Sequence, residues 1–151
     1  MASVKGGGRV LDEYFRAMSE FRHQIRRFQR FSEEVATEAG VELQQHLLML
    51  AIRGLPPGQR PSIRVIADRL LLKHHSVVEL VDRSERMGLV RRVAARDDRR
   101  QVLLELTAKG ERLLREIFVQ NREKLRSQSA ELTEALMRLT REQRVARPRR
   151  R

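Results

Sequence analysis

The sequence predicts a mostly α-helical fold with a small β-hairpin wing, in which a winged helix-turn-helix lobe is flanked along the chain by long helices. Two observations in the middle of the chain carry this prediction. Two amphipathic helical segments follow one another after residue 61, and two strand-like runs, residues 89–93 and 101–107, come next, joined by a charged loop. Such a unit places one helix in a DNA major groove and the hairpin beside it.

Apolar spacing justifies each element of this lobe, residues 41–107. A short helix opens it, and residues 54–61, which hold three of the four prolines, form a loop. Two further helices carry apolar residues at helical spacing, namely Ile63, Ile66, Ala67 and Leu70 in the first and Val77, Val78, Leu80, Val81 and, more loosely, Met87 in the second. Gly88 ends the second helix, because glycine tolerates the left-handed dihedrals found at helix ends.

Long helices are predicted on both sides of the lobe, at residues 10–39 and 108–143. The first carries an apolar stripe at near-heptad spacing: Leu11, Tyr14, Met18, Phe21, Ile25 and Phe28. A lone exposed helix would leave this stripe in water, so we expect both segments to be dimerisation helices that pair with a symmetry mate. The alternative is that the first helix packs on its own domain. Polar residues indicate a break or a kink in the second helix near residues 127–129.

Residues 10–143 are thus expected to form a single domain, with no fixed structure on either side of it. Residues 1–9, which contain three consecutive glycines, are expected to be a flexible lead. Residues 144–151 carry five arginines and a proline, and we expect this basic tail to be disordered.

Composition favours a polyanionic partner. Lys+Arg 32 against Asp+Glu 20 gives a formal net charge of +12, and nucleic acid is the commonest partner for such a charge. An anionic membrane surface competes, but no apolar run approaches the roughly 20 residues that span a bilayer, and no signal-peptide pattern opens the chain. Because there is no cysteine, disulfides and thiolate metal sites are excluded. We expect a cytoplasmic protein without a cofactor.

Candidate base-reading residues lie on the second helix of the motif, whose N-terminal end would reach base edges. The candidate DNA contacts here are Lys73, His74, His75, Ser76, Glu79, Arg83 and Arg86. Their varied chemistry suits base edges, whereas gripping phosphate needs only lysine and arginine. Ser76 or its neighbour is also a candidate N-cap. The alternative is a solvated helix face that binds nothing.

The wing gives a stronger signal, because arginines crowd around two acids. The arginines are Arg91, Arg92, Arg96, Arg99 and Arg100, and the acids are Asp97 and Asp98. Arginine is planar and more weakly hydrated than lysine, so it suits a narrow minor groove. An aspartate would repel phosphate, and we therefore expect one of the two to hold an arginine in place through a bidentate ion pair.

These motifs resemble the MarR family of multiple-antibiotic-resistance-type regulators. The family's wing pattern is matched by Asp98, Arg100, Leu104, Leu106 and Thr107, and residues 80–92 resemble its recognition helix and first wing strand. The resemblance extends from about residue 11 to residue 139. It implies an obligate homodimer that binds double-stranded DNA at pseudo-palindromic operators, usually as a repressor. It also implies that any small-molecule effector binds between the dimerisation helices and the DNA lobe.

The same resemblance assigns roles to single residues. It implies that Arg96 or Arg99 is the minor-groove residue at the wing tip, and that Asp98 and Arg100 brace the hairpin. Ser84 departs from the family, which usually has a core-facing leucine at this position, and this change can loosen the packing of the recognition helix. The thiol-sensing branch of the family is excluded, because its reactive cysteine is absent.

Other functions are less consistent with the sequence. No histidines with an acidic partner stand at metal-ligand spacing, and no nucleophile motif or glycine-rich phosphate loop indicates an enzyme. Two alternatives to a specific regulator stay open: an architectural protein that coats DNA regardless of sequence, and a winged helix used for protein contacts. Acids interleaved in the basic surface speak against the first of these: Glu79, Asp82, Glu85, Asp97 and Asp98.

Overall fold

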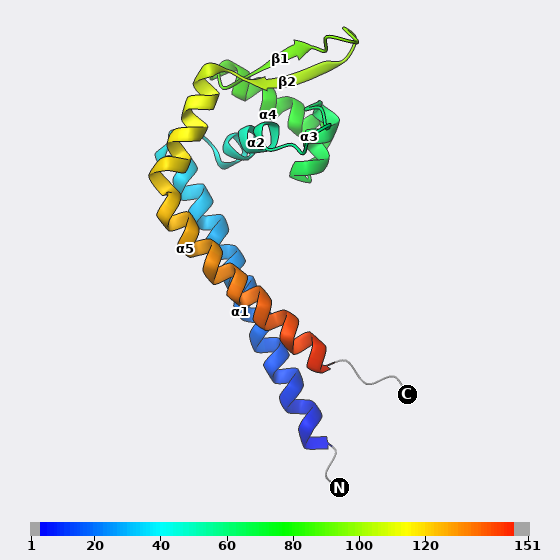
Figure 1. The fold of residues 1–151 in the computed structure, drawn as a ribbon, viewed down its shortest axis with the longest axis vertical. Helices are drawn as coiled ribbons and strands as arrows, with labels where there is room; N and C mark the ends of the chain where they lie inside the picture. The colour runs from blue at the N-terminus through cyan, green and yellow to red at the C-terminus, as the bar shows by residue number, and fades with distance from the viewer. Residues whose placement is uncertain (1–3, 147–151) are drawn as a thin grey trace. The chain divides into compact units, whose positions relative to one another are not determined.

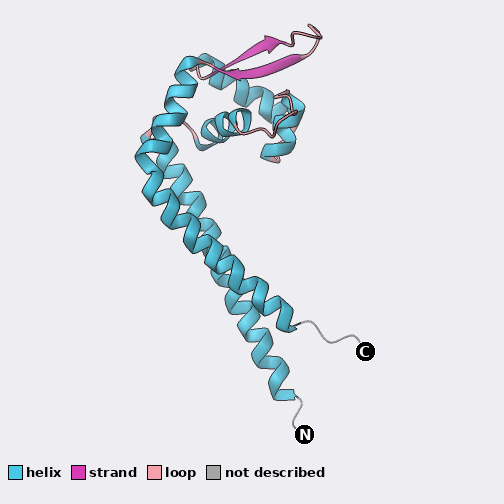
Figure 2. Cartoon of the chain, viewed as in Figure 1, coloured by secondary structure: helices cyan, strands magenta, loops and turns pink. Residues whose placement is uncertain are grey.

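The computed structural model describes residues 4–146, with side chains for residues 8–142. Along this range the elements are α1 (Val4–Glu38), α2 (Leu43–Arg53), α3 (Ile63–Leu70), α4 (His74–Arg86), β1 (Val90–Ala94), β2 (Val102–Leu106) and α5 (Ala108–Ala146) (Figures 1 and 2). The predicted fold class, mostly helical with a hairpin wing, is confirmed. The chain divides into two compact units. These are the winged-helix unit, residues 33–120, and the helical unit, formed by the described parts of residues 1–32 and 121–151.

The core of the winged-helix unit lies where α2, α3 and α4 pack on one another and on the hairpin. Its fully buried side chains include Leu48, Met49, Ile66, Val77, Leu80, Val81, Leu89 and Leu104. Each contributes about 1.5–3 kcal/mol by leaving water. Apart from Val78, which is partly buried, and Met87, which is 38% exposed, the apolar spacing seen in the sequence is the spacing of this core. It fixes which faces of α3 and α4 remain outside.

The hairpin is joined to the rest of this unit at both of its strands. β1 and β2 pair antiparallel, with Val90 opposite Leu106 and Ala94 opposite Val102. Gly88 has φ 69°, the left-handed conformation expected between α4 and the first strand. On the other strand, the Leu104 backbone N–H donates to the Pro61 carbonyl at 2.8 Å, which ties β2 to the segment before α3.

Where the hairpin leads into α5, Thr107 and Gly110 close the unit. The Thr107 backbone N–H donates to the Leu89 carbonyl at 3.1 Å, and Thr107 Oγ1 accepts from the Gly110 N–H at 3.0 Å. A Cβ at Gly110 would stand 2.1 Å from the Leu89 carbonyl oxygen. Only glycine therefore allows the start of α5 to approach the strand this closely.

The long helices differ from their predicted bounds. α1 begins at Val4, so residues 4–9 of the expected flexible lead are helical, because glycine costs a helix entropy but does not block it sterically. The break expected as one alternative near residues 127–129 is wrong, since α5 is a continuous helix through these residues. Thr133 Oγ1 donates to the Ser129 carbonyl at 2.8 Å, one turn back along the uninterrupted helix. The expected basic tail begins inside α5, and residues 147–151 lie outside the described range.

In the helical unit, an ion pair and a cation–π contact join α1 to α5. Arg27 forms an ion pair with Glu131, and the Lys124 ammonium lies 5.0 Å from the ring centroid of Phe31. The predicted stripe is incompletely covered: Leu11 is half exposed, and the other five residues are partly buried, namely Tyr14, Met18, Phe21, Ile25 and Phe28. The stripe neither closes a core of its own nor stands free in water.

Candidate nucleic-acid interface

Helix α4 divides its residues between the core and an exposed line. The buried residues are Val77, Leu80, Val81 and Ser84. His75, Glu79, Asp82 and Arg86 follow one another at spacings of four, three and four residues, which places them along one line of the helix. All four are exposed. The side of α4 that faces away from the core is therefore polar and chemically mixed.

The N-terminal end of α4 carries three exposed side chains, those of Lys73, His74 and His75. Lys73 occupies the N-cap position, and its side chain makes no capping hydrogen bond. The hypothesis that Ser76 or its neighbour caps the helix is wrong, because the helix begins at His74. Ser76 itself is partly buried, so it stands beside the exposed line rather than on it.

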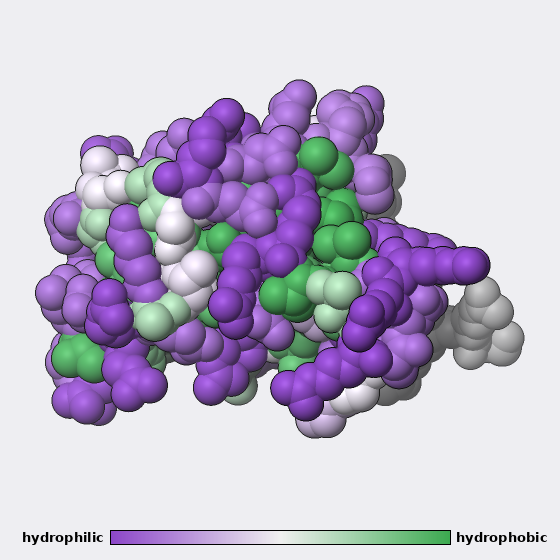
Figure 3. Space-filling model, turned by 90° about the horizontal axis from the view of Figure 1, so that it is seen from above, coloured by the Kyte–Doolittle hydropathy of each residue, from purple (hydrophilic) through white to green (hydrophobic). Residues whose placement is uncertain are grey.

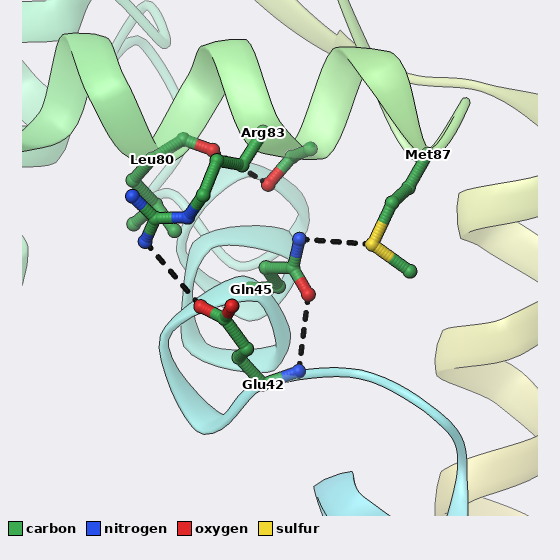
Figure 4. A network of polar contacts seen from close by, with 6 residues as sticks. Glu42, Gln45, Leu80, Arg83 and Met87 are labelled. Carbon is green, nitrogen blue, oxygen red and sulfur yellow. Dashed lines mark hydrogen bonds and ion pairs between the residues drawn. The ribbon is translucent and has the colours of Figure 1, made fainter.

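Arg83 lies in a network that connects α4 to the start of α2 (Figure 4). Its Nη2 lies 3.3 Å from Glu42 Oε2, and its Nε is buried without a partner among the described residues. Gln45 extends the network: its Oε1 accepts from the Glu42 backbone N–H at 3.0 Å, and its Nε2 lies 3.1 Å from Met87 Sδ. The structure thus places this predicted DNA contact in an internal interaction.

Ser84 is buried in the core of the unit, with its hydroxyl hydrogen-bonded. Its side chain is completely buried, and its Oγ donates to the Leu80 carbonyl at 2.8 Å (Figure 4). A buried hydroxyl costs stability only when it lacks a hydrogen bond, and this one is satisfied by the preceding turn of its own helix. The departure from the family pattern is therefore compatible with close packing of α4.

Two acids of α4 bind the first strand of the wing. Arg92 on β1 places its Nη2 2.8 Å from Asp82 Oδ1 and also forms an ion pair with Glu85. The Glu85 carboxylate accepts a second bond, from the Arg92 backbone N–H at 2.8 Å. These contacts fix the angle between hairpin and helix, and they neutralise two acids that the sequence had placed in the DNA-facing surface.

At the wing tip, three arginines have no ion-pair partner, whereas one aspartate is paired. Arg96, Arg99 and Arg100 are exposed and form no ion pair within the described part of the chain. Asp97 receives both Nη atoms of Arg60, at 2.7 and 3.0 Å, and the hydrogen bond from this guanidinium lowers the pKa of the carboxyl below its ordinary value.

The expected bidentate pair therefore exists, but with other partners than predicted. Asp98 and Arg100 interact only through a local turn, in which Asp98 Oδ1 accepts from the Arg100 backbone N–H at 3.0 Å. The brace across the lobe is formed by Asp97 and Arg60. Sequence reasoning missed Arg60 because it lies in a proline-rich loop, 37 residues from its partner.

Arg64 is a further exposed cation that the sequence pattern did not single out. It stands in the first turn of α3, outside the buried pair Ile66 and Ala67, and no ion pair to it is found among the described residues. Arg64 was not identified from the sequence, because it lies between the apolar residues of α3 that predict the helix.

Seen from above, hydrophilic side chains cover most of the visible face of the molecule, with apolar patches between them (Figure 3).

A cavity of about 280 Å³ lies within the winged-helix unit, behind the C-terminal end of α4. Its lining combines apolar side chains with two cations and one acid: Ala39, Gly40, Val41, Met87, Leu89, Lys109, Arg112, Leu113 and Glu116. Lys109 Nζ donates to the Met87 carbonyl at 2.7 Å, at the end of the helix that carries the exposed line. The cavity thus touches the same helix as the candidate interface.

Neither a group of metal-ligating side chains nor a membrane-spanning helix is found in the part of the chain that the structure describes. No three histidine or acidic side chains of residues 8–142 are grouped so that they could hold a metal ion. Within the described helices, no segment is long and apolar enough to cross a membrane.

Comparison with known proteins agrees with this architecture. Residues 39–101 match the model of the MarR family, which confirms the family resemblance of the sequence motifs. None of the curated proteins is similar enough in sequence to match the chain.

Solved structures share the fold at low sequence identity. A MarR family transcription regulator has a TM-score of 0.69 at 22% identity, over 87% of this chain and 90% of that chain. A point mutant of MarR from E. coli, complexed with operator DNA, has a TM-score of 0.61 at 19% identity, over 75% and 76%. CouR from Rhodococcus jostii RHA1, bound to p-coumaroyl-CoA, has a TM-score of 0.51 at 22% identity, over 69% and 64%.

Proposed function

We propose that this chain, whose winged helix belongs to the MarR family, is a DNA-binding transcriptional regulator that recognises a specific operator. In this proposal it is a cytoplasmic homodimer, and it represses transcription from a pseudo-palindromic site. α4 enters the major groove, with Lys73, His74, His75, Glu79 and Arg86 toward the DNA, and Arg96 and Arg99 of the wing enter the adjacent minor groove.

The observation that carries the proposal is the exposed line of α4 beside an unpaired wing tip. Of the acids once placed in the DNA-facing surface, Asp82, Glu85 and Asp97 have arginine partners inside the lobe. Glu79 is exposed and has no ion pair among the described residues. A protein that only grips phosphate gains nothing from such an acid, whereas a glutamate can accept a hydrogen bond from the cytosine amino group.

Competition binding tests specificity. A selection of bound fragments from a random-sequence DNA library should recover a palindromic motif, and specific binders typically prefer their site over bulk DNA by roughly 10³–10⁷-fold. An architectural protein would bind selected and scrambled duplexes equally. A winged helix used for protein contacts would show no salt-dependent affinity for either duplex.

The homodimer is proposed from the apolar surface that α1 leaves open. Leu11 and Phe15 are 50% and 57% exposed, and the half-covered stripe runs on from them to Phe28. In a two-fold symmetric dimer, the same apolar surface of a second copy would cover this one, so that both are buried. Light scattering at micromolar concentration should give twice the chain mass of 17.7 kDa, and a monomer would contradict the proposal.

A small-molecule effector is proposed for the cavity behind α4. Its apolar walls with Lys109 and Arg112 suit an organic anion that has an apolar body. A carboxylate that took Lys109 from the Met87 carbonyl would release a contact at the end of α4. The similarity in fold to CouR, which was solved with p-coumaroyl-CoA, motivates a first screen of aromatic acids and their thioesters. A screening hit should weaken DNA binding, and Lys109→Met should abolish that response.

A further inference from the structure

We propose that Arg60 and Asp97 form a clamp that positions the wing tip for DNA binding. The proposal rests on the DNA-binding function proposed above. It assigns a role to two residues that neither touch the exposed line of α4 nor belong to the unpaired arginines of the tip. Both are positioning residues, since their contact is with each other and not with the nucleic acid.

The geometry of the pair is that of two parallel hydrogen bonds. Arg60 Nη1 lies 3.0 Å from Asp97 Oδ2, and Arg60 Nη2 lies 2.7 Å from Asp97 Oδ1. This fork-to-fork arrangement restricts orientation as well as distance, which a single-point ion pair does not do. Asp97 is therefore held at a defined place relative to the loop before α3.

The clamp is the outer of two attachments between that loop and the hairpin. The inner attachment is the hydrogen bond from the Leu104 N–H to the Pro61 carbonyl, 2.8 Å long. Beyond it, the backbone hydrogen bonds found within residues 95–101 are local: Ala95 N–H donates to the Gln101 carbonyl and Gln101 N–H to the Asp98 carbonyl, both at 2.9 Å. In the described residues, Asp97 thus provides the polar side-chain contact that ties the tip to the rest of the lobe.

Because the pair is exposed, we infer that it orders the wing tip rather than stabilises the fold. The side chains of Arg60 and Asp97 are 41% and 70% exposed, and ion pairs this open to water contribute little to folding. A tip held in place before it meets DNA loses less conformational freedom on binding. The arginines that gain from this order are Arg96, Arg99 and Arg100.

Direct roles of Arg60 or Asp97 at the DNA would give different measurements from a clamp. If Arg60 itself bound a phosphate, removing it would lower the salt dependence of DNA binding by about one counterion. If Asp97 acted only as a negative charge near the DNA, replacing it with asparagine would strengthen binding. A clamp predicts weaker binding from either replacement and no change in salt dependence.

The first experiment uses the free protein, so that it does not depend on DNA binding. Because the chain contains no cysteine, Arg99→Cys gives a single site for a nitroxide spin label at the wing tip. We expect Asp97→Asn and Arg60→Gln each to sharpen the spectrum of this label, since the tip gains mobility. Glu105→Gln is the matched control, because it removes an exposed acid of the hairpin that pairs with Arg91 within the wing. Unchanged spectra in both clamp variants would overturn the proposal.

The second experiment measures affinity for the duplex recovered by selection, with the native cysteine-free chain. We expect Arg60→Gln and Asp97→Asn each to weaken binding about three- to tenfold, the range for re-ordering one or two side chains, and the double variant to be no weaker than either. Glu105→Gln should leave affinity unchanged or raise it. Stronger binding by Asp97→Asn, or a smaller salt slope in Arg60→Gln, would overturn the clamp. A wild-type chain that bound no duplex would refute the proposed function and leave the spin-label result to decide the clamp.

Discussion

The base and the tip of the wing carry the same residue type and use it differently. At the base, Arg91 pairs with Glu105 at 2.9 Å, and Arg92 pairs with Asp82 and Glu85. At the tip, the three arginines between residues 96 and 100 are exposed and form no ion pair within the described chain. A count of arginines therefore overstates the positive charge that the wing offers to a polyanion, because the charge of a paired arginine is largely neutralised by its partner.

The largest effect on stability is expected at the base. Arg92→Ala leaves Asp82 and Glu85 without their common partner, and the Arg92 side chain is only 29% exposed. We expect the free energy of unfolding to fall by about 1–3 kcal/mol, the usual cost of unpairing partly buried charged groups. Urea denaturation measures it. Arg91→Ala, which breaks the more exposed pair, should stay within about 0.5 kcal/mol of wild type; equal losses would show that burial does not separate the two pairs.

At the tip, the expected effect is on DNA affinity rather than on the fold. Arg96→Ala and Arg99→Ala should weaken binding to operator and random DNA alike, because phosphate and minor-groove contacts carry little sequence information. Each loss should lower the salt slope by about one counterion. Arg83→Ala is the matched control: Arg83 is held by Glu42, so its loss should leave the slope unchanged. A reduced slope in this control would mean that paired arginines also contact phosphate.

A smaller effect, on specificity alone, is expected along α4. His75 lies on the exposed line, so His75→Ala should reduce the preference for the operator by about 1–3 kcal/mol if it loses one base contact. Ser76 is partly buried beside the line, and Ser76→Ala should change the preference less. The ratio of operator to random-DNA affinity, measured together with a thermal melt, checks both. A larger loss from Ser76→Ala would place the base-reading side of α4 elsewhere.

The smallest effect concerns pH and a buried histidine of α2. His46 is 8% exposed, its Nδ1 has no partner among the described residues, and burial lowers its pKa from 6.5. The unfolded chain thus takes up this proton at a higher pH than the folded chain. The stability that the fold gains from keeping His46 neutral is fully present above pH 6.5. It is lost as the pH falls toward the lowered pKa of the folded state. Urea denaturation between neutral and mildly acidic pH should show the free energy of unfolding falling as the pH falls, and His46→Gln should reduce this pH dependence.

The types of the elements followed from the sequence, because periodicity and turn chemistry act over a few residues. The centres of the apolar repeats of α3 and α4 became buried, with Met87 at the end of α4 left exposed. Gly88 took the left-handed conformation after α4, and the two strand-like runs paired as a hairpin. Most of the predicted DNA contacts are exposed at α4 or at the wing tip, namely Lys73, His74, His75, Glu79, Arg86, Arg96 and Arg99. Ser76 is partly buried and Arg83 is paired with Glu42. Local signals were less reliable for the extent of the long helices, as the early start of α1 and the absence of a break inside α5 show.

Which charges are free was decided only by the tertiary structure. The acids Asp82 and Glu85 of α4 form ion pairs with Arg92, and Arg83 forms one with Glu42. Of the two adjacent aspartates, Asp97 and not Asp98 forms the bidentate pair. Arg83 and Arg60 find their partners 41 and 37 residues away in the chain. A sequence pattern specifies which residues share a face of one helix or strand. The distance between two side chains on different elements depends on how those elements pack, and an ion pair forms only where packing brings its two groups within about 4 Å.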